Sequence, residues 1–126
     1  MSLVIETASG AEAFRDAPDE LTAPAGSTIT LKLRNRTDPV DEVGHDWVLV
    51  RPGQEASVVA RAIKAGDDRD WLDPDDRGVI AATHLIEGAL DDSVAFAAPS
   101  PGTYTFLCTF PEHFAGGMRG TLTIQP

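Results

Sequence analysis

The chain has 126 residues, of which 42% are apolar, and its formal net charge is −10 at neutral pH. That length predicts one domain over residues 1–126 with enough residues to bury a core, and residues 1–3 are either its beginning or a start added for expression. The negative charge argues against binding to nucleic acid or to an anionic membrane surface. No apolar run is long enough to cross a bilayer, so we expect no direct membrane insertion.

Six short stretches have the pattern of β-strands, because each is rich in β-branched residues or alternates apolar with polar side chains. In "STITLKLR", for example, Ile29, Leu31 and Leu33 fall on one face of the strand. Gly- and Pro-containing turns separate the stretches, a pattern that favours an antiparallel sandwich or barrel. The stretches are residues 3–7, 27–34, 44–50, 93–97, 103–108 and 120–125.

One part of the chain does not fit a strand pattern. Residues 54–63, "QEASVVARAI", fit a short helix or an irregular flap, and the acidic residues 67–76 follow it. We therefore expect a helix or flap insertion near residues 54–76. Its acidic part is interpreted as a solvated flap, with a docking face for a basic partner such as a cytochrome as the alternative. The aspartates lack the spacing of an EF-hand loop, so a calcium site is rejected.

The most informative stretch is residues 108–120, "CTFPEHFAGGMRG", which holds the only cysteine of the chain. The preceding strand cannot continue through it, because Pro111 has no N–H to donate and the Gly-Gly pair permits a tight return. Cys108, His113 and Met118 therefore lie on one loop that joins two strands. A loop this short can direct a thiol, an imidazole and a thioether toward one point.

This donor set suits copper, because thiolate and thioether ligands hold Cu(I) and imidazole serves both oxidation states. A site of two histidines, one cysteine and a weak axial methionine is typical of blue-copper electron transfer. The second histidine must come from elsewhere in the chain. His45 is preferred, because it begins an apolar strand that Trp47 anchors, and His84 is interpreted as a surface or structural histidine.

Two motifs of the sequence resemble those of a known family. "GHDWVLV" together with "CTFPEHFAGGMRGTLTI" is similar to the cupredoxins, in particular to the azurins and auracyanins. The resemblance implies an all-β fold, an eight-stranded Greek-key sandwich with copper near one end. It also implies that His45, Cys108 and His113 are the equatorial ligands of one type 1 copper and that Met118 is the axial ligand. The backbone carbonyl of Gly44 would approach the metal from the opposite side.

The sequence departs from azurin in three respects. Four residues separate His113 from Met118 where azurin has three, which is closer to the auracyanins. The structural disulfide of azurin is absent, because the chain has one cysteine. Asp46 follows the first histidine where asparagine is usual; its carboxylate can accept hydrogen bonds from Thr109 but cannot donate when ionised, and the alternative is that it points to solvent.

We predict an electron-transfer protein rather than an enzyme, since a nucleophilic cysteine would give no reason for Met118. The backbone N–H of Phe110 is expected to donate to the Cys108 sulfur, because Pro111 has none. Val43 and Phe114, with Ala115, are expected to form an apolar patch where electrons leave through His113.

The expected partners are transient redox proteins such as a cytochrome or a copper oxidoreductase, and the chain is expected to be a monomer. Through the resemblance, its location is periplasmic or otherwise extracytoplasmic, with a membrane tether on a longer chain as one form. Two alternatives remain for function: a copper carrier or homeostasis domain, and the type 1 copper domain of a larger redox enzyme.

Overall fold

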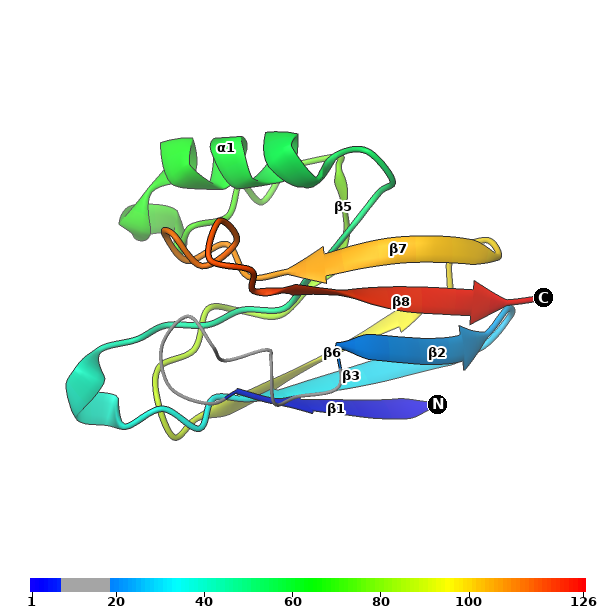
Figure 1. The fold of residues 1–126 in the computed structure, drawn as a ribbon, viewed down its shortest axis with the longest axis horizontal. Helices are drawn as coiled ribbons and strands as arrows, with labels where there is room; N and C mark the ends of the chain where they lie inside the picture. The colour runs from blue at the N-terminus through cyan, green and yellow to red at the C-terminus, as the bar shows by residue number, and fades with distance from the viewer. Residues whose placement is uncertain (8–18) are drawn as a thin grey trace.

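Two β-sheets pack face to face in the computed structural model, which describes residues 1–7 and 19–126 (Figure 1). The smaller sheet has the order β1-β3-β6, with β1 parallel to β3 and β3 antiparallel to β6. Its strands are β1 (Ser2–Glu6), β3 (Thr28–Arg34) and β6 (Asp91–Ala97). The described residues form eight strands in two sheets, which confirms the predicted all-β sandwich of about eight strands.

The larger sheet has the order β2-β8-β7-β4-β5. Strand β2 runs parallel to β8, and the remaining pairs are antiparallel. Its strands are β2 (Glu20–Pro24), β4 (Val48–Val50), β5 (Val79–Ala82), β7 (Gly102–Leu107) and β8 (Arg119–Gln125).

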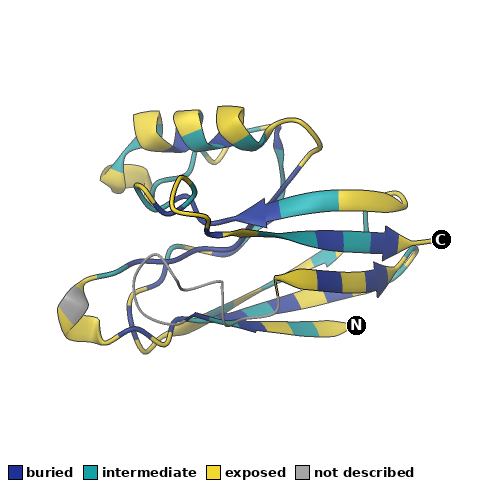
Figure 2. Ribbon diagram, in the orientation of Figure 1, coloured by how far each residue is buried: buried dark blue, intermediate teal, exposed yellow. Residues whose placement is uncertain are grey.

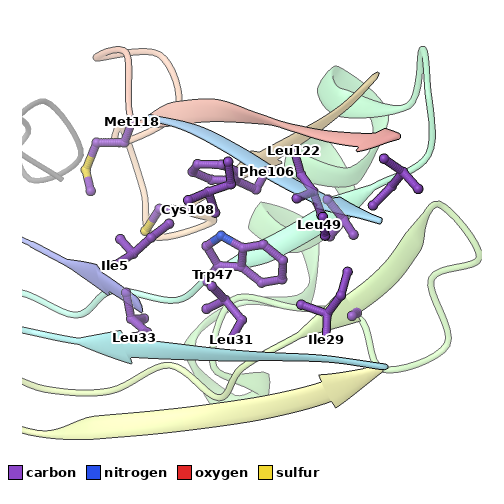
Figure 3. Packing of buried hydrophobic residues seen from close by; sticks show 14 of the residues in the cluster. Ile5, Ile29, Leu31, Leu33, Trp47, Leu49, Phe106, Cys108, Met118 and Leu122 are labelled. Carbon is purple, nitrogen blue, oxygen red and sulfur yellow. The ribbon is translucent and has the colours of Figure 1, made fainter. Parts of the chain in front are cut away.

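The core between the sheets follows the alternation of the sequence. Ile29, Leu31 and Leu33 of β3 are fully buried, whereas Thr28 and Thr30 are exposed and Lys32 is half-buried. The same alternation is visible along the strands in Figure 2. Trp47 lies at the centre of the core, with its ring 5.6 Å from that of Phe106 (Figure 3). Side chains at period 2 on the two inner faces therefore make one continuous core.

Strand β4 breaks this alternation, because all three of its residues are buried. Leu49 faces the main core, and Val48 and Val50 belong to a second cluster with Val58 of the helix α1 (Glu55–Ala65). The helix thus covers the outer face of the larger sheet (Figure 1). The predicted helix near residues 54–76 is confirmed, and its position on the sheet explains why a strand of this length can be apolar on both faces.

The acidic segment after α1 is partly solvated, as predicted, but one of its residues is not. It contains the 3-10 helix η3 (Asp67–Arg69) and a series of turns. The Asp76 side chain is 1% exposed and accepts two hydrogen bonds from Arg61 of α1, each of 2.8 Å. This bidentate pair joins the end of the segment to the helix.

Strands β2 and β5 were not predicted. Strand β2 has few β-branched residues and ends at Pro24, and β5 is four residues long. The predicted strand over residues 44–50 is shorter than expected, because only Val48–Val50 forms a regular ladder. His45 makes an isolated antiparallel bridge to Ile86 instead. No helix within the described ranges is both long and apolar enough to span a membrane.

Candidate metal centre

The segments that carry the predicted ligands meet at the end of the sandwich opposite the two marked termini (Figure 1). His45 precedes β4 and is fixed by two backbone hydrogen bonds to Ile86, of 3.0 and 2.9 Å. Cys108 follows the end of β7, and its N–H donates to the carbonyl of Met118 at 3.3 Å. Rigid strand ends therefore hold donors that are far apart in the sequence.

Three of the four predicted side-chain ligands form a compact group. The ligand atoms of His45, Cys108 and His113 all lie within 4.8 Å of one another. The Cys108 sulfur lies 3.8 Å from Nδ1 of His45 and 3.4 Å from Nδ1 of His113. All three residues are buried, with His113 the most exposed at 7%. Both imidazoles direct Nδ1 toward the Cys108 sulfur. A set of two histidines and one cysteine suits a trigonal metal site.

Met118 closes the loop that carries His113. Its N–H donates to the His113 carbonyl at 3.0 Å, and its side chain is fully buried. Gly117 before it has a φ of +98°, a conformation that glycine adopts without strain. Met118 and Cys108 belong to the same core cluster, and both lie at one end of it in Figure 3. This places the thioether at the same end of the core as the thiol.

The protonation states of the group suit metal binding. Burial, and secondarily the neighbouring His113, lowers the pKa of His45 to about 3. Burial also lowers the pKa of His113, against the opposite effect of Glu112. Both imidazoles are therefore neutral at physiological pH and have a lone pair to offer. Burial, and then the charge of Asp46, raises the pKa of the Cys108 thiol well above its usual range. The thiol therefore keeps its proton at neutral pH unless a metal cation displaces it.

Two backbone N–H groups, those of Asp46 and Phe110, lower the pKa of the Cys108 thiol and so oppose the effects of burial and of the Asp46 charge. A hydrogen bond from the Phe110 N–H to the sulfur stays a prediction. Hydrogen bonds to a ligand sulfur stabilise its negative charge and fix its direction. The structure thus prepares this sulfur to act as a thiolate ligand.

Asp46 is 1% exposed, so the alternative in which it points to solvent is wrong. Its Oδ1 accepts from the N–H of Thr109 at 2.7 Å, and its Oδ2 accepts from the Thr109 hydroxyl. Burial raises the pKa of this carboxyl to about 6, and the hydrogen bonds from Thr109 oppose that rise. The carboxylate ties the His45 segment to the Cys108 segment.

Gly44 is buried and tightly surrounded. A Cβ at this position would lie 3.1 Å from carbon atoms of both Leu85 and Phe110. Packing therefore favours glycine here, because a side chain would require Leu85 and Phe110 to move by a few tenths of an ångström. The approach of its carbonyl to a metal stays a prediction.

A residue that sequence reasoning missed is Asn35, at the end of β3. Its side chain is 1% exposed and its Nδ2 donates to the carbonyls of Val43 and Ile86, at 3.1 and 2.9 Å. Its Oδ1 accepts from the N–H of Thr37 at 3.0 Å. Asn35 thus joins the segment before His45 to the segment of Ile86, which pairs with His45. A single asparagine at a strand end gives no signal of this role in the sequence.

The remaining predicted residues lie as follows. His84 is 88% exposed and its ring contacts Asp92, which agrees with its interpretation as a surface histidine. Val43 and Phe114 are half-buried and Ala115 is exposed. The guanidinium of Arg119 lies 5.2 Å from the centre of the Phe114 ring. The expected apolar patch therefore has a cation at its edge.

The buried set of one thiol, two imidazole nitrogens and a thioether at the same end of the core fits one copper ion by the chemistry of its donors. Calcium or magnesium would require oxygen ligands, whereas this group offers nitrogen and sulfur, and the carboxylate that follows His45, Asp46, accepts hydrogen bonds from Thr109.

Comparison with known proteins agrees with this assignment. Residues 3–125 match the family of copper binding proteins described as the plastocyanin/azurin family. Over 124 residues the chain is 35% identical to auracyanin-B of Chloroflexus aurantiacus, covering 97% of this chain and 52% of that protein. It is 36% identical to auracyanin-A of the same organism, covering 98% of this chain and 75% of that protein. The chain thus spans about half the length of the first relative and three quarters of the second.

Among solved structures, the dithionite-reduced auracyanin of Roseiflexus castenholzii superimposes with a TM-score of 0.88 at 37% identity, over 99% of this chain and 97% of that one. The agreement in fold therefore extends over essentially the whole chain. The family match, the relatives and the buried donor set lead to one conclusion: this chain belongs to the plastocyanin/azurin family of copper-binding proteins.

Proposed function

We propose that this chain is a blue-copper protein that carries single electrons between redox proteins, with one type 1 copper held by His45, Cys108, His113 and Met118. The observation that carries the proposal is the position of the Cys108 sulfur, buried and 3.8 and 3.4 Å from the Nδ1 atoms of two neutral histidines. Bound copper supplies the one-electron change between Cu(I) and Cu(II). The carbonyl of Gly44 is proposed as a further, weak contact.

The role of the surrounding residues is to keep the donors in place in both oxidation states. The bridge from His45 to Ile86, the hydrogen bond from the Cys108 N–H to the Met118 carbonyl and the contacts of Asp46 with Thr109 all fix the ligand segments without the metal. A site that is already arranged needs little movement when the charge of the metal changes, and this favours fast electron transfer. On metal binding, the thiol proton of Cys108 passes to solvent and the sulfur binds as thiolate.

His113 is proposed as the residue through which electrons leave, since it is the most exposed of the three grouped donors, at 7%. Val43, Phe114 and Ala115 would form the apolar surface around it. Transient redox contacts are small, so a patch of this size suffices for a partner such as a cytochrome or a copper oxidoreductase. The proposal includes a monomeric single domain that is not an enzyme and works outside the cytoplasm, with or without a tether on a longer chain.

The test is to add one equivalent of Cu(II) to metal-free protein and record visible absorption and electron paramagnetic resonance spectra. The proposal expects an intense thiolate-to-copper band and a narrow copper hyperfine splitting. The variant C108S should lose both, whereas H84Q, which removes the exposed histidine, should keep both. A faint band with a wide splitting, or reduction of the copper without reversible reoxidation, would refute electron transfer and favour a copper carrier.

A further inference from the structure

An aromatic contact path leads from the two histidines to the acidic segment after α1. The ring centroids of His45 and His113 are 4.8 Å apart, and the ring of Phe110 lies 4.8 Å from that of His113. The ring of Trp71 meets Phe110 edge-on, with centroids 6.4 Å apart and an interplanar angle of 71°. All three separations are those of aromatic rings in contact. The path is therefore continuous from His45 to Trp71.

The turn that positions Trp71 has an unfavourable backbone conformation. Asp70 and Trp71 have φ values of 54° and 57°, and two successive non-glycine residues in this left-handed region are unusual. The N–H of Trp71 donates to the carbonyl of Gly66 at 3.0 Å, and that of Asp70 donates to the carbonyl of Asp67 at 3.0 Å. The tight turn thus directs the indole toward Phe110 instead of leaving it free in solvent.

Trp71 lies at the outer end of the path. It is half-buried, whereas His113 is 7% exposed. Phe110 between them is also half-buried and packs against the main core. A partner that contacts the indole therefore reaches the histidine through two ring contacts, without displacing any core residue.

We propose that Trp71 is a second point at which electrons enter and leave the copper centre, through its contact with Phe110 and the contact of Phe110 with His113. This inference rests on the proposed function. Electronic coupling falls steeply across empty or solvent-filled gaps and less steeply through rings in contact. One electron passes between the partner and the copper centre, so one of them is oxidised as the other is reduced. No covalent bond is made or broken, and no proton is transferred.

The experiment uses a photo-oxidisable ruthenium bipyridine complex bound to a surface histidine of the copper-loaded protein. In the first protein, D68H in an H84Q background places the label on the exposed residue three positions before Trp71. The matched control is E87H in the same H84Q background, which places the label on an exposed residue next to Ile86. Ile86 is hydrogen-bonded to His45, so the route from this label reaches the copper ligands without Trp71.

The rate of electron transfer from Cu(I) to photogenerated Ru(III) is measured with Trp71, W71F and W71L. We expect W71L to slow transfer to the label at position 68 by roughly tenfold, and W71F, which keeps a ring, to slow it by only about twofold. Transfer to the label at position 87 should not change. The reduction potential and the thiolate-to-copper band should also be the same in all variants. In the metal-free protein Trp47 is fully buried, so acrylamide should quench mainly the part of the fluorescence that W71F lacks.

Two results would overturn the inference. If W71L leaves the rate to the label at position 68 unchanged, the path does not carry electrons. If W71L slows transfer to both labels and shifts the potential, Trp71 only supports the shape of the site. Failure of the proposed function is distinguishable from both, because the wild-type protein would then lack the thiolate band and a reversible potential.

Discussion

Asp46 accepts two hydrogen bonds from Thr109, one from the backbone N–H at 2.7 Å and one from the hydroxyl, across 63 residues of sequence. The two residues are the immediate successors of His45 and Cys108 in the chain. Their contact therefore fixes one ligand segment relative to the other. It also places a buried carboxyl group close to the Cys108 sulfur. Two predictions follow from the charge and from the hydrogen bonds of this pair.

The first prediction concerns the charge. D46N removes a buried negative charge that favours Cu(II) over Cu(I), so the reduction potential at pH 8 should rise. The expected rise is on the order of 50–100 mV, since unit charges several Å apart interact by roughly 1–3 kcal/mol at an effective dielectric constant of about 20. Voltammetry measures it, and D68N, which removes an exposed carboxylate, is the control that should shift the potential by much less. A potential in D46N that is unchanged or lower would contradict this role.

The second prediction concerns the hydroxyl of Thr109. T109V keeps the shape of the side chain but leaves Oδ2 of the buried Asp46 without this donor. The unfolding free energy of the metal-free protein should fall by about 1–3 kcal/mol, the range for an unsatisfied buried polar group. T109S restores the hydroxyl and should recover most of the loss. Urea denaturation followed by tryptophan fluorescence measures both, and equal stability of T109V and T109S would count against the hydrogen bond.

The third prediction concerns Asn35, whose amide group holds the carbonyls of Val43 and Ile86. N35L leaves these groups without their donor and should lower the unfolding free energy by roughly 2–4 kcal/mol. Because both carbonyls flank His45, the hyperfine splitting of bound Cu(II) should also widen. L90A, which truncates an exposed side chain, is the control. If N35L loses stability but keeps the wild-type spectrum, Asn35 supports the fold without positioning His45.

The fourth prediction concerns pH and the pair of Arg61 with Asp76. Hydrogen bonds from Arg61 lower the pKa of Asp76 below its ordinary value of 3.8. A carboxyl whose pKa is lower in the folded state stabilises the fold above its unfolded pKa and loses this contribution as pH falls through the folded pKa. D76N should therefore be less stable than wild type at pH 7, and the difference should shrink below about pH 4. A difference in melting temperature that stays constant from pH 7 to pH 3 would disprove the linkage.

The sequence predicts the features that depend on local patterns. The alternation in β3 places Ile29, Leu31 and Leu33 in the core, and the interruption of the last hairpin at Pro111 places Cys108, His113 and Met118 on one loop. The apolar strand that Trp47 anchors favours His45 over His84, and the resemblance to cupredoxins implies the same choice.

The features that depend on packing between distant segments could not be predicted in this way. Strand β2 is held by its pairing with β8, and little in its own composition favours a strand. The burial of Asp46 follows from its contact with Thr109, and the burial of Asp76 from its contact with Arg61 of the preceding helix. The contact of Trp71 with Phe110 arises from a turn with positive φ values that the residues themselves do not favour.

We expect His45, Cys108, His113 and Met118 to hold one copper ion in nearly the same arrangement in both oxidation states. The decisive measurement is X-ray absorption at the copper edge, on the same sample before and after reduction. We predict one short copper–sulfur and two copper–nitrogen distances in Cu(II) protein, with only small changes in Cu(I) protein. Loss of a nitrogen ligand on reduction, or the absence of a short copper–sulfur distance in Cu(II) protein, would contradict it.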